Sequence, residues 1–252
     1  MTRILAVANQ KGGVGKTTTV INLGASISVH DKEVLIIDLD PQANATSGLG
    51  LREADTNGIH NFVSGDCSLA ECVVKTEVEG LSLVRGTRHL AGTEIELATE
   101  EEREFFLEQA LSNSDLSGYD YVLIDCPPSL GLLTINALVA ADGVILTVQS
   151  EYYALEGLSH LMETIRRIRA HWNTELSIFG VVLTMYDKRL KLSREVEQEA
   201  DEFLGKALFT TRIPRNVRLS EAPSHGKPVI LYDAYSSGAK SYMSLAREVL
   251  AR

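Results

Sequence analysis

Cysteine is scarce in this 252-residue sequence, which holds Cys67, Cys72 and Cys126. An odd number of cysteines without a secretory signal argues against a framework of disulfides. Cys67 and Cys72 stand five residues apart with no cluster of histidines or further cysteines nearby, so their pattern does not indicate a metal site. The sequence therefore predicts that all three are thiols, either in the core or at the surface.

Long apolar runs are also missing. No segment approaches the roughly 18 apolar residues that a membrane-spanning helix needs. The apolar run at residues 4–8 is too short for a signal peptide and ends in a polar loop. We therefore expect a soluble, cytoplasmic protein that has no membrane partner.

Positive charge is in short supply, with 24 Lys and Arg against 34 Asp and Glu and a net charge of −10. Such a balance argues at first against nucleic acid as a partner. The deficit is uneven, however, because residues 1–126 carry −11 and residues 127–252 carry +1. The second half therefore has room for a local basic patch.

Short apolar runs alternate with amphipathic stretches of helical period. The runs lie at residues 4–8, 34–38, 81–84, 121–125, 144–148 and 180–184. The helical stretches lie near residues 16–30, 94–112, 131–141, 152–172, 189–205 and 237–251. Runs that are apolar on both sides indicate parallel strands covered by helices. The alternation predicts an α/β fold with one doubly wound, mostly parallel sheet and helices on both faces. Because no linker or repeat interrupts it, we expect a single domain over residues 1–252.

Two stretches carry less information. The acidic run E-E-E-R-E at residues 100–104 is typical of a solvated helix face or the start of a helix. Residues 50–80 show no clear periodicity, and we assign them no element. In a doubly wound sheet, ligands bind at the carboxyl ends of the strands, so the functional motifs are sought there.

The strongest motif is N-Q-K-G-G-V-G-K-T-T at residues 9–18, between a predicted strand and a predicted helix. Its glycines let backbone N–H groups turn toward phosphate, and the helix amino terminus adds partial positive charge. Lys16 is expected to reach the β- and γ-phosphates of ATP, and the Thr17 hydroxyl to bind Mg²⁺. The loop residues expected to bind the nucleotide are Gly12, Gly13, Val14, Gly15, Lys16, Thr17 and Thr18. The motif departs from the usual pattern at Gln10, where the first glycine would stand, and it carries a second lysine, Lys11.

Carboxylates follow two of the other predicted strands. L-I-I-D-L-D-P-Q at residues 35–42 places Asp38 and Asp40 at the carboxyl edge of the sheet, and V-L-I-D-C-P-P at residues 122–128 places Asp125 there. One of the first two could hold Mg²⁺ through water while the other orients an attacking water. Asp125 resembles the acidic residue that supports Mg²⁺ in P-loop proteins.

Five motifs together resemble the ParA/Soj chromosome-partitioning ATPases, which belong to the deviant Walker A class of P-loop NTPases. The motifs are K-G-G-V-G-K-T-T, D-L-D-P-Q-A-N-A-T-S-G-L-G, D-C-P-P-S-L-G, E-Y-Y-A-L-E-G-L and I-P-R-N-V-R-L-S-E-A-P-S-H-G-K-P. They span residues 4 to about 232, and the last is the most specific to the partitioning branch. The resemblance implies an ATPase that forms an ATP-dependent homodimer with two nucleotides between the subunits. We expect slow hydrolysis by the protein alone, because no obvious strong general base stands in the motifs at residues 9–18, 35–42 and 122–128.

The resemblance also assigns roles to single residues. It implies that Lys11 crosses to the phosphates of the other subunit, that Gly12 stays small where the partner chain approaches, and that Asp40 is needed for hydrolysis. Asp38 and Asp125 match carboxylates near Mg²⁺. A further match implies that the segment beside the adenine includes Pro214 and Asn216.

The family binds double-stranded DNA as a dimer and without sequence preference, and a ParB-type centromere-binding protein stimulates its hydrolysis. Arg189 and Arg218 match positions of DNA-contacting arginines in the family, and Lys188, beside the first, is a further candidate for DNA contact. Contacts to phosphate alone give affinity without sequence readout. The resemblance therefore implies a nucleoid-associated protein of the cytoplasm.

Two other functions compete with this interpretation. A MinD-like positioning ATPase would end in a basic amphipathic helix that lies in the lipid interface, but S-L-A-R-E-V-L-A-R at residues 244–252 is short and lacks bulky aromatic residues. A nucleotide switch that regulates replication initiation is the second alternative, and it fits the same motifs.

Overall fold

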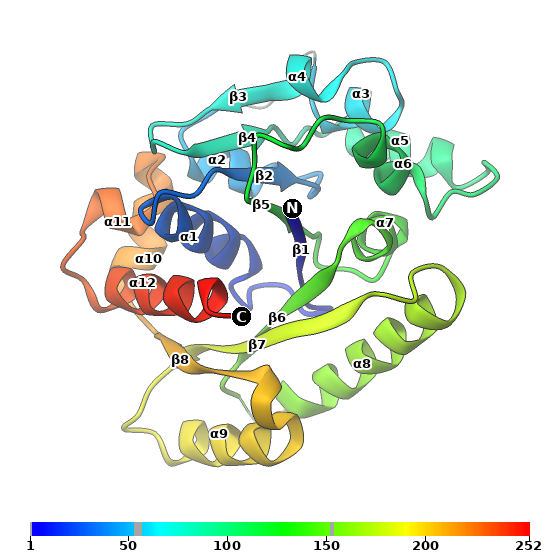
Figure 1. Ribbon diagram of the computed structural model, residues 1–252. Helices are drawn as coiled ribbons and strands as arrows, with labels where there is room; N and C mark the ends of the chain where they lie inside the picture. The colour runs from blue at the N-terminus through cyan, green and yellow to red at the C-terminus, as the bar shows by residue number, and fades with distance from the viewer. Residues whose placement is uncertain (1, 53–56, 152–153) are drawn as a thin grey trace.

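The computed structural model describes residues 2–52, 57–151 and 154–252, and within them eight strands form one sheet (Figure 1). The strand order is β3-β4-β2-β5-β1-β6-β7-β8, and every neighbouring pair is parallel except β3 with β4. The strands are β1 (Arg3–Ala8), β2 (Val34–Asp38), β3 (Val73–Lys75), β4 (Leu81–Val84), β5 (Tyr121–Asp125), β6 (Gly143–Gln149), β7 (Ser177–Tyr186) and β8 (Leu208–Pro214).

Helices cover both faces of this sheet (Figure 1). They are α1 (Lys16–Ser28), α2 (Asn44–Gly48), α3 (Ile59–Val63), α4 (Leu69–Cys72), α5 (Leu90–Leu97), α6 (Phe106–Ser112), α7 (Leu132–Ala140), α8 (Ala154–His171), α9 (Lys191–Leu204), α10 (Val217–Glu221), α11 (Val229–Tyr232) and α12 (Ser237–Leu250). None of the described helices is both long and apolar enough to cross a bilayer.

Alternate residues of the central strands point into two separate apolar cores. On β1, Ala6 and Ala8 pack toward α7 and α8, while Leu5 and Val7 pack toward α1 and α12. All of β2 and β5 is buried, which explains why these strands read as unbroken apolar runs. The predicted doubly wound sheet is confirmed, and the six predicted strands lie within β1, β2, β4, β5, β6 and β7.

The predicted helix 94–112 is wrong, because the chain forms α5 and α6 with a turn over residues 98–105 between them. The acidic run therefore lies in a turn. Like charges crowded over residues 100–104 disfavour a helix, and Glu102 takes a left-handed φ of 54°. Arg103 then donates to the Ala98 carbonyl at 2.6 Å and so satisfies the last turn of α5. The first two residues of the predicted helix 152–172 lie outside the described residues.

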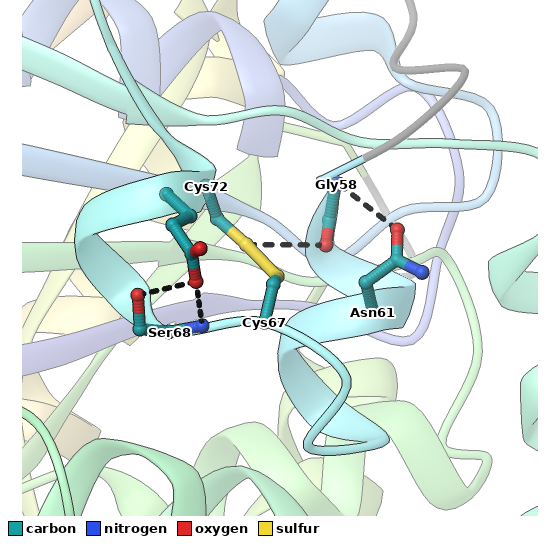
Figure 2. The surroundings of a disulfide bond; sticks show 6 residues. Gly58, Asn61, Cys67, Ser68 and Cys72 are labelled. Carbon is teal, nitrogen blue, oxygen red and sulfur yellow. Dashed lines mark hydrogen bonds between the residues drawn. A yellow bond between two sulfur atoms is a disulfide. The ribbon is translucent and has the colours of Figure 1, made fainter.

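The expectation of thiols is wrong for Cys67 and Cys72, which form a disulfide, and is confirmed for Cys126, which is buried and free (Figure 2). The helix α4 begins two residues after Cys67, holds only four residues and ends at Cys72. Its capping box, in which Glu71 accepts from the Ser68 N–H at 2.8 Å, turns the chain back and leaves the two Cα atoms 6.9 Å apart. Sequence spacing alone does not reveal this turn.

Candidate nucleotide-binding site

The loop between β1 and α1 has the backbone that phosphate binding requires. Gly13 and Gly15 have φ values of 74° and 86°, a left-handed region that residues with a side chain rarely adopt. Helix α1 begins at Lys16, and no side chain caps its amino terminus. The first N–H groups of the helix thus remain available to an anion, and the helix dipole favours negative charge there.

Lys16 lies at the base of this loop with a relative exposure of 6%. Its Nζ donates to the Lys11 carbonyl at 3.1 Å, which closes the loop over the side chain. Burial lowers the pKa of Lys16, and the Asp125 carboxylate opposes that shift. A cation held in a buried site by few partners is suited to a phosphate ligand.

Two cavities meet at the loop. One of about 520 Å³ holds the predicted phosphate-binding residues together with Asp40, and the other, of about 340 Å³, holds Pro214 and Asn216. Gly15, Thr18, Met185 and Pro223 line both. The predicted residues that line the first cavity are Gly12, Gly13, Gly15, Lys16, Thr17, Thr18 and Asp40. Val14 is buried behind the loop and lines neither cavity.

Asp38 and Asp125 end the neighbouring strands β2 and β5 in register with one another. Both carboxyl groups are buried, and burial raises the pKa of Asp38 to about 6 and raises that of Asp125 well above its usual range. Asp38 is engaged by Thr46, whose N–H and hydroxyl donate to it at 2.8 and 2.7 Å. The two carboxylate oxygens of Asp125 have no hydrogen-bond partner among the described residues.

These groups suit Mg²⁺ that is shared with a nucleotide. In the described part of the chain, no three His, Cys, Asp or Glu side chains converge as a protein-only metal site. Mg²⁺ instead uses one or two carboxylates together with substrate phosphates and water. Asp125 fits this requirement because its carboxylate oxygens have no hydrogen-bond partner among the described residues. The Thr17 hydroxyl lies close enough to Asp125 to oppose the rise in the pKa of that carboxyl, and it is the second candidate Mg²⁺ ligand.

Lys11 lies outside the phosphate cavity. Its Nζ pairs with Glu151 at 3.2 Å, and its side chain is 61% exposed. A smaller cavity of about 30 Å³ lies beside it, lined in part by Asn9 and Glu151. Lys11 and Lys16 are therefore on one loop but face different surroundings.

Sequence reasoning missed Thr184 and Met185, which follow each other at the end of β7. The Thr184 hydroxyl donates to the Val14 carbonyl at 2.8 Å, and its methyl group lies about 3.7 Å from where a Cβ on Gly15 would stand. Met185 takes a left-handed φ of 51° between the two cavities. No motif marks these residues, because their role depends on a contact across 170 positions of sequence.

The predicted DNA-contacting residues Lys188 and Arg189 follow β7, Arg218 follows β8, and the ends of both strands line the second cavity. Tyr186 of β7 and Pro214 of β8 are in register, so the segments that carry Arg189 and Arg218 leave the same edge of the sheet. Arg218 is on α10, whose Leu219 lines the second cavity. Asn216 caps this helix by accepting from the Arg218 N–H at 3.0 Å.

The parallel sheet and the glycine loop at its carboxyl edge define a P-loop nucleotide-binding protein. A family model described as an AAA domain matches residues 2–178. The sporulation initiation inhibitor protein Soj of Bacillus subtilis is 52% identical over 252 residues, which cover 100% of this chain and 99% of that protein. The chromosome partitioning protein ParA of Caulobacter vibrioides is 49% identical, with 99% and 94% of the two chains covered. The chain belongs to the ParA/Soj family.

A solved structure of a similar protein was crystallised with a nucleotide. Cobyrinic acid a,c-diamide synthase from Mycobacterium smegmatis, crystallised with ADP and magnesium, is 37% identical with a TM-score of 0.85. The match covers 99% of this chain and 94% of that one. Both the fold and the ligand class of that protein agree with the loop geometry described above.

Proposed function

We propose that this protein is an ATP-dependent DNA-partitioning ATPase that segregates chromosomes or plasmids. In this proposal, ATP with Mg²⁺ occupies the two joined cavities and drives dimerisation, and the dimer binds double-stranded DNA without sequence preference. A ParB-type partner stimulates slow hydrolysis and so releases the DNA. The observation that carries the proposal is the different placement of the two lysines, because Lys16 faces its own phosphate cavity and Lys11 faces solvent.

Within its own chain Lys11 pairs with Glu151 outside the phosphate cavity, so it meets a nucleotide phosphate only if a second chain approaches. In the described structure a Cβ on Gly12 would meet nothing closer than Pro128 at 3.7 Å, which is an ordinary contact. A requirement for glycine at this position would therefore come from a neighbouring molecule. We propose that Lys11 leaves Glu151 and reaches the neighbour's phosphates, where a cation in trans stabilises the developing charge.

Asp40 is the proposed residue for orienting water. Its side chain is nearly buried, lines the phosphate cavity and accepts from the Gln42 N–H at 3.0 Å, which fixes one of its oxygens. When bound, Mg²⁺ would neutralise charge on the phosphates, and Thr17 and Asp125 would hold it directly or through water, with Asp38 behind them. We propose slow hydrolysis, since no carboxylate in the motifs at residues 9–18, 35–42 and 122–128 is placed as a strong general base.

The DNA-binding part is tested with Arg218→Glu. The variant is expected to lose retardation of a DNA duplex in the presence of ATP and Mg²⁺, because a charge reversal turns a phosphate contact into a repulsion. It should still dimerise with ATP, as measured by light scattering. Salt-sensitive retardation at the strength of the unaltered protein would place the DNA surface elsewhere.

A further inference from the structure

The two arginines assigned above to DNA, Arg189 and Arg218, are already bound by carboxylates of their own chain. Arg218 donates through Nη1 to Glu221 at 2.8 Å, and its Nε pairs with Asp233 at 3.2 Å. Arg189 pairs with Asp187 through Nη2 at 2.7 Å and through Nε at 3.0 Å. In both cases carboxylates occupy guanidinium N–H groups, which are the donors that would bind a phosphate.

The carboxylates that pair with each arginine form a clamp on it, and the clamp on Arg218 consists of Glu221 and Asp233. Glu221 stands one turn along α10 from Arg218 and also accepts from the Tyr232 hydroxyl at 3.2 Å. The ring of Tyr232 in turn stacks on His225, with centroids 4.8 Å apart. The pKa of Glu221 is lowered, chiefly by its hydrogen bond to Arg218, so the carboxylate stays ionised at neutral pH. Glu221 is therefore held against the arginine by its own surroundings.

The clamp on Arg189 is tighter. Asp187 accepts from both the side chain and the backbone N–H of Arg189, the latter at 3.0 Å. Chiefly because of the side-chain bond, the pKa of Asp187 falls to about 2. Its side chain is 22% exposed, whereas that of Arg189 is 84% exposed. The carboxylate lies in the protein surface, and the arginine extends over it.

These ion pairs offset the positive charge of the surface around Arg189 and Arg218. Arg189 and Asp187 cancel, and Arg218 is outnumbered by Glu221 and Asp233. Lys188 has no ion-pair partner in the described part of the chain, so it is the cation of this group whose charge is not offset locally. A phosphate that approaches either arginine has to displace a carboxylate or accept its repulsion.

We propose that Glu221 and Asp187 are affinity-setting residues, which compete with DNA phosphate for Arg218 and Arg189 and keep DNA binding weak. This proposal rests on the proposed function, since it needs the two arginines to contact DNA. Weak sites in each subunit make tight binding depend on the two copies that an ATP dimer brings together. The clamps would thus tie DNA binding to nucleotide state without contacting the nucleotide.

The test is Glu221→Gln in the full chain. Glutamine keeps the shape and can still accept from Tyr232, but it removes the competing charge. The dissociation constant for a labelled DNA duplex is measured by fluorescence anisotropy with a non-hydrolysable ATP analogue and Mg²⁺. Exposed ion pairs of this kind predict DNA binding about two- to fivefold tighter than for the unaltered protein. Asp187→Asn should act in the same direction.

The matched control is Glu79→Gln, which changes the net charge equally on an exposed residue beside Gly80, at the opposite end of the sheet. It should leave DNA affinity unchanged. Glu221→Gln combined with Arg218→Ala should gain nothing over Arg218→Ala alone. An unchanged or weaker affinity for Glu221→Gln would overturn the proposal, and so would a gain that persists without Arg218. If Arg218→Ala alone leaves DNA binding intact, both this proposal and the DNA surface of the proposed function are wrong.

Discussion

Lys16 and Lys11 differ in burial although only four residues separate them. Lys16 is enclosed by the loop, and Lys11 is exposed and paired with Glu151. We expect Lys16→Ala to abolish ATP binding, since hydrogen bonds to charged groups contribute about 1.5–3 kcal/mol each. Binding of a fluorescent ATP analogue measures this loss. An unchanged affinity in the Lys16→Ala protein would show that the phosphates bind elsewhere.

Thr184 provides a test of how the loop is held in place. In Thr184→Val the Val14 carbonyl loses its buried donor, which costs about 1–3 kcal/mol. We expect a lower free energy of unfolding in urea and weaker ATP binding. Thr184→Ser keeps the hydroxyl and should retain the affinity of the unaltered protein. Equal ATP affinities for the valine and serine variants would rule out a positioning role.

Individual site residues differ in how far sequence can find them. Gly13, Gly15 and Lys16 form a local motif whose chemistry is readable without a fold. Thr184 carries no such signal, because it acts through a contact with Val14 that exists only once β7 lies near the loop. Asp38 shows a different limit of prediction from sequence. Its position was predictable, but its bonds to Thr46 depend on how α2 begins.

The strands and helices show a similar division. The buried central strands were predictable because they are apolar on both faces, whereas β8 was missed because it is an edge strand with polar residues and partial exposure. The antiparallel strand β3 has three residues, too few for a period. The short helices α10 and α11 were missed for the same reason, although α10 lines the second cavity.

The contact between β7 and β8 can be tested at Gly180. A Cβ there would collide with the ring of Phe209 and lie 2.8 Å from Nη1 of Arg252. We expect Gly180→Ala to lower the free energy of unfolding by about 1–3 kcal/mol, as overpacking does elsewhere. Gly118→Ala is the matched control, because a Cβ at Gly118 meets nothing within 4 Å. Equal urea midpoints for the two variants would contradict the packing described here.

Taken as a whole, the molecule carries a net charge of −10, yet its proposed ligands are ATP and DNA, which are both anions. For ATP, the cation Lys16 in the phosphate cavity offsets the negative charge of the phosphates despite the net charge of the chain. For DNA, we propose that the carboxylates paired with Arg189 and Arg218 weaken binding to one chain, so that tight binding uses two chains. This makes the assembly of the dimer the central step of the account.

Asp40→Ala tests whether hydrolysis ends the dimeric state. Without Asp40 the attacking water loses its orienting group, so ATP should persist in the cavity. We expect the variant to stay dimeric and bound to DNA long after the unaltered protein has released it. Size-exclusion chromatography with ATP and Mg²⁺ follows the lifetime. A variant that remains monomeric with ATP would show that Asp40 has another role.

The most direct measurement is the mass of the protein by light scattering, with and without ATP and Mg²⁺, for the unaltered chain and for Lys11→Ala. If Lys11 serves the nucleotide of a neighbour, ATP should double the mass of the unaltered protein, and Lys11→Ala should bind ATP but remain monomeric. A Lys11→Ala protein that dimerises with ATP as readily as the unaltered chain would contradict the account.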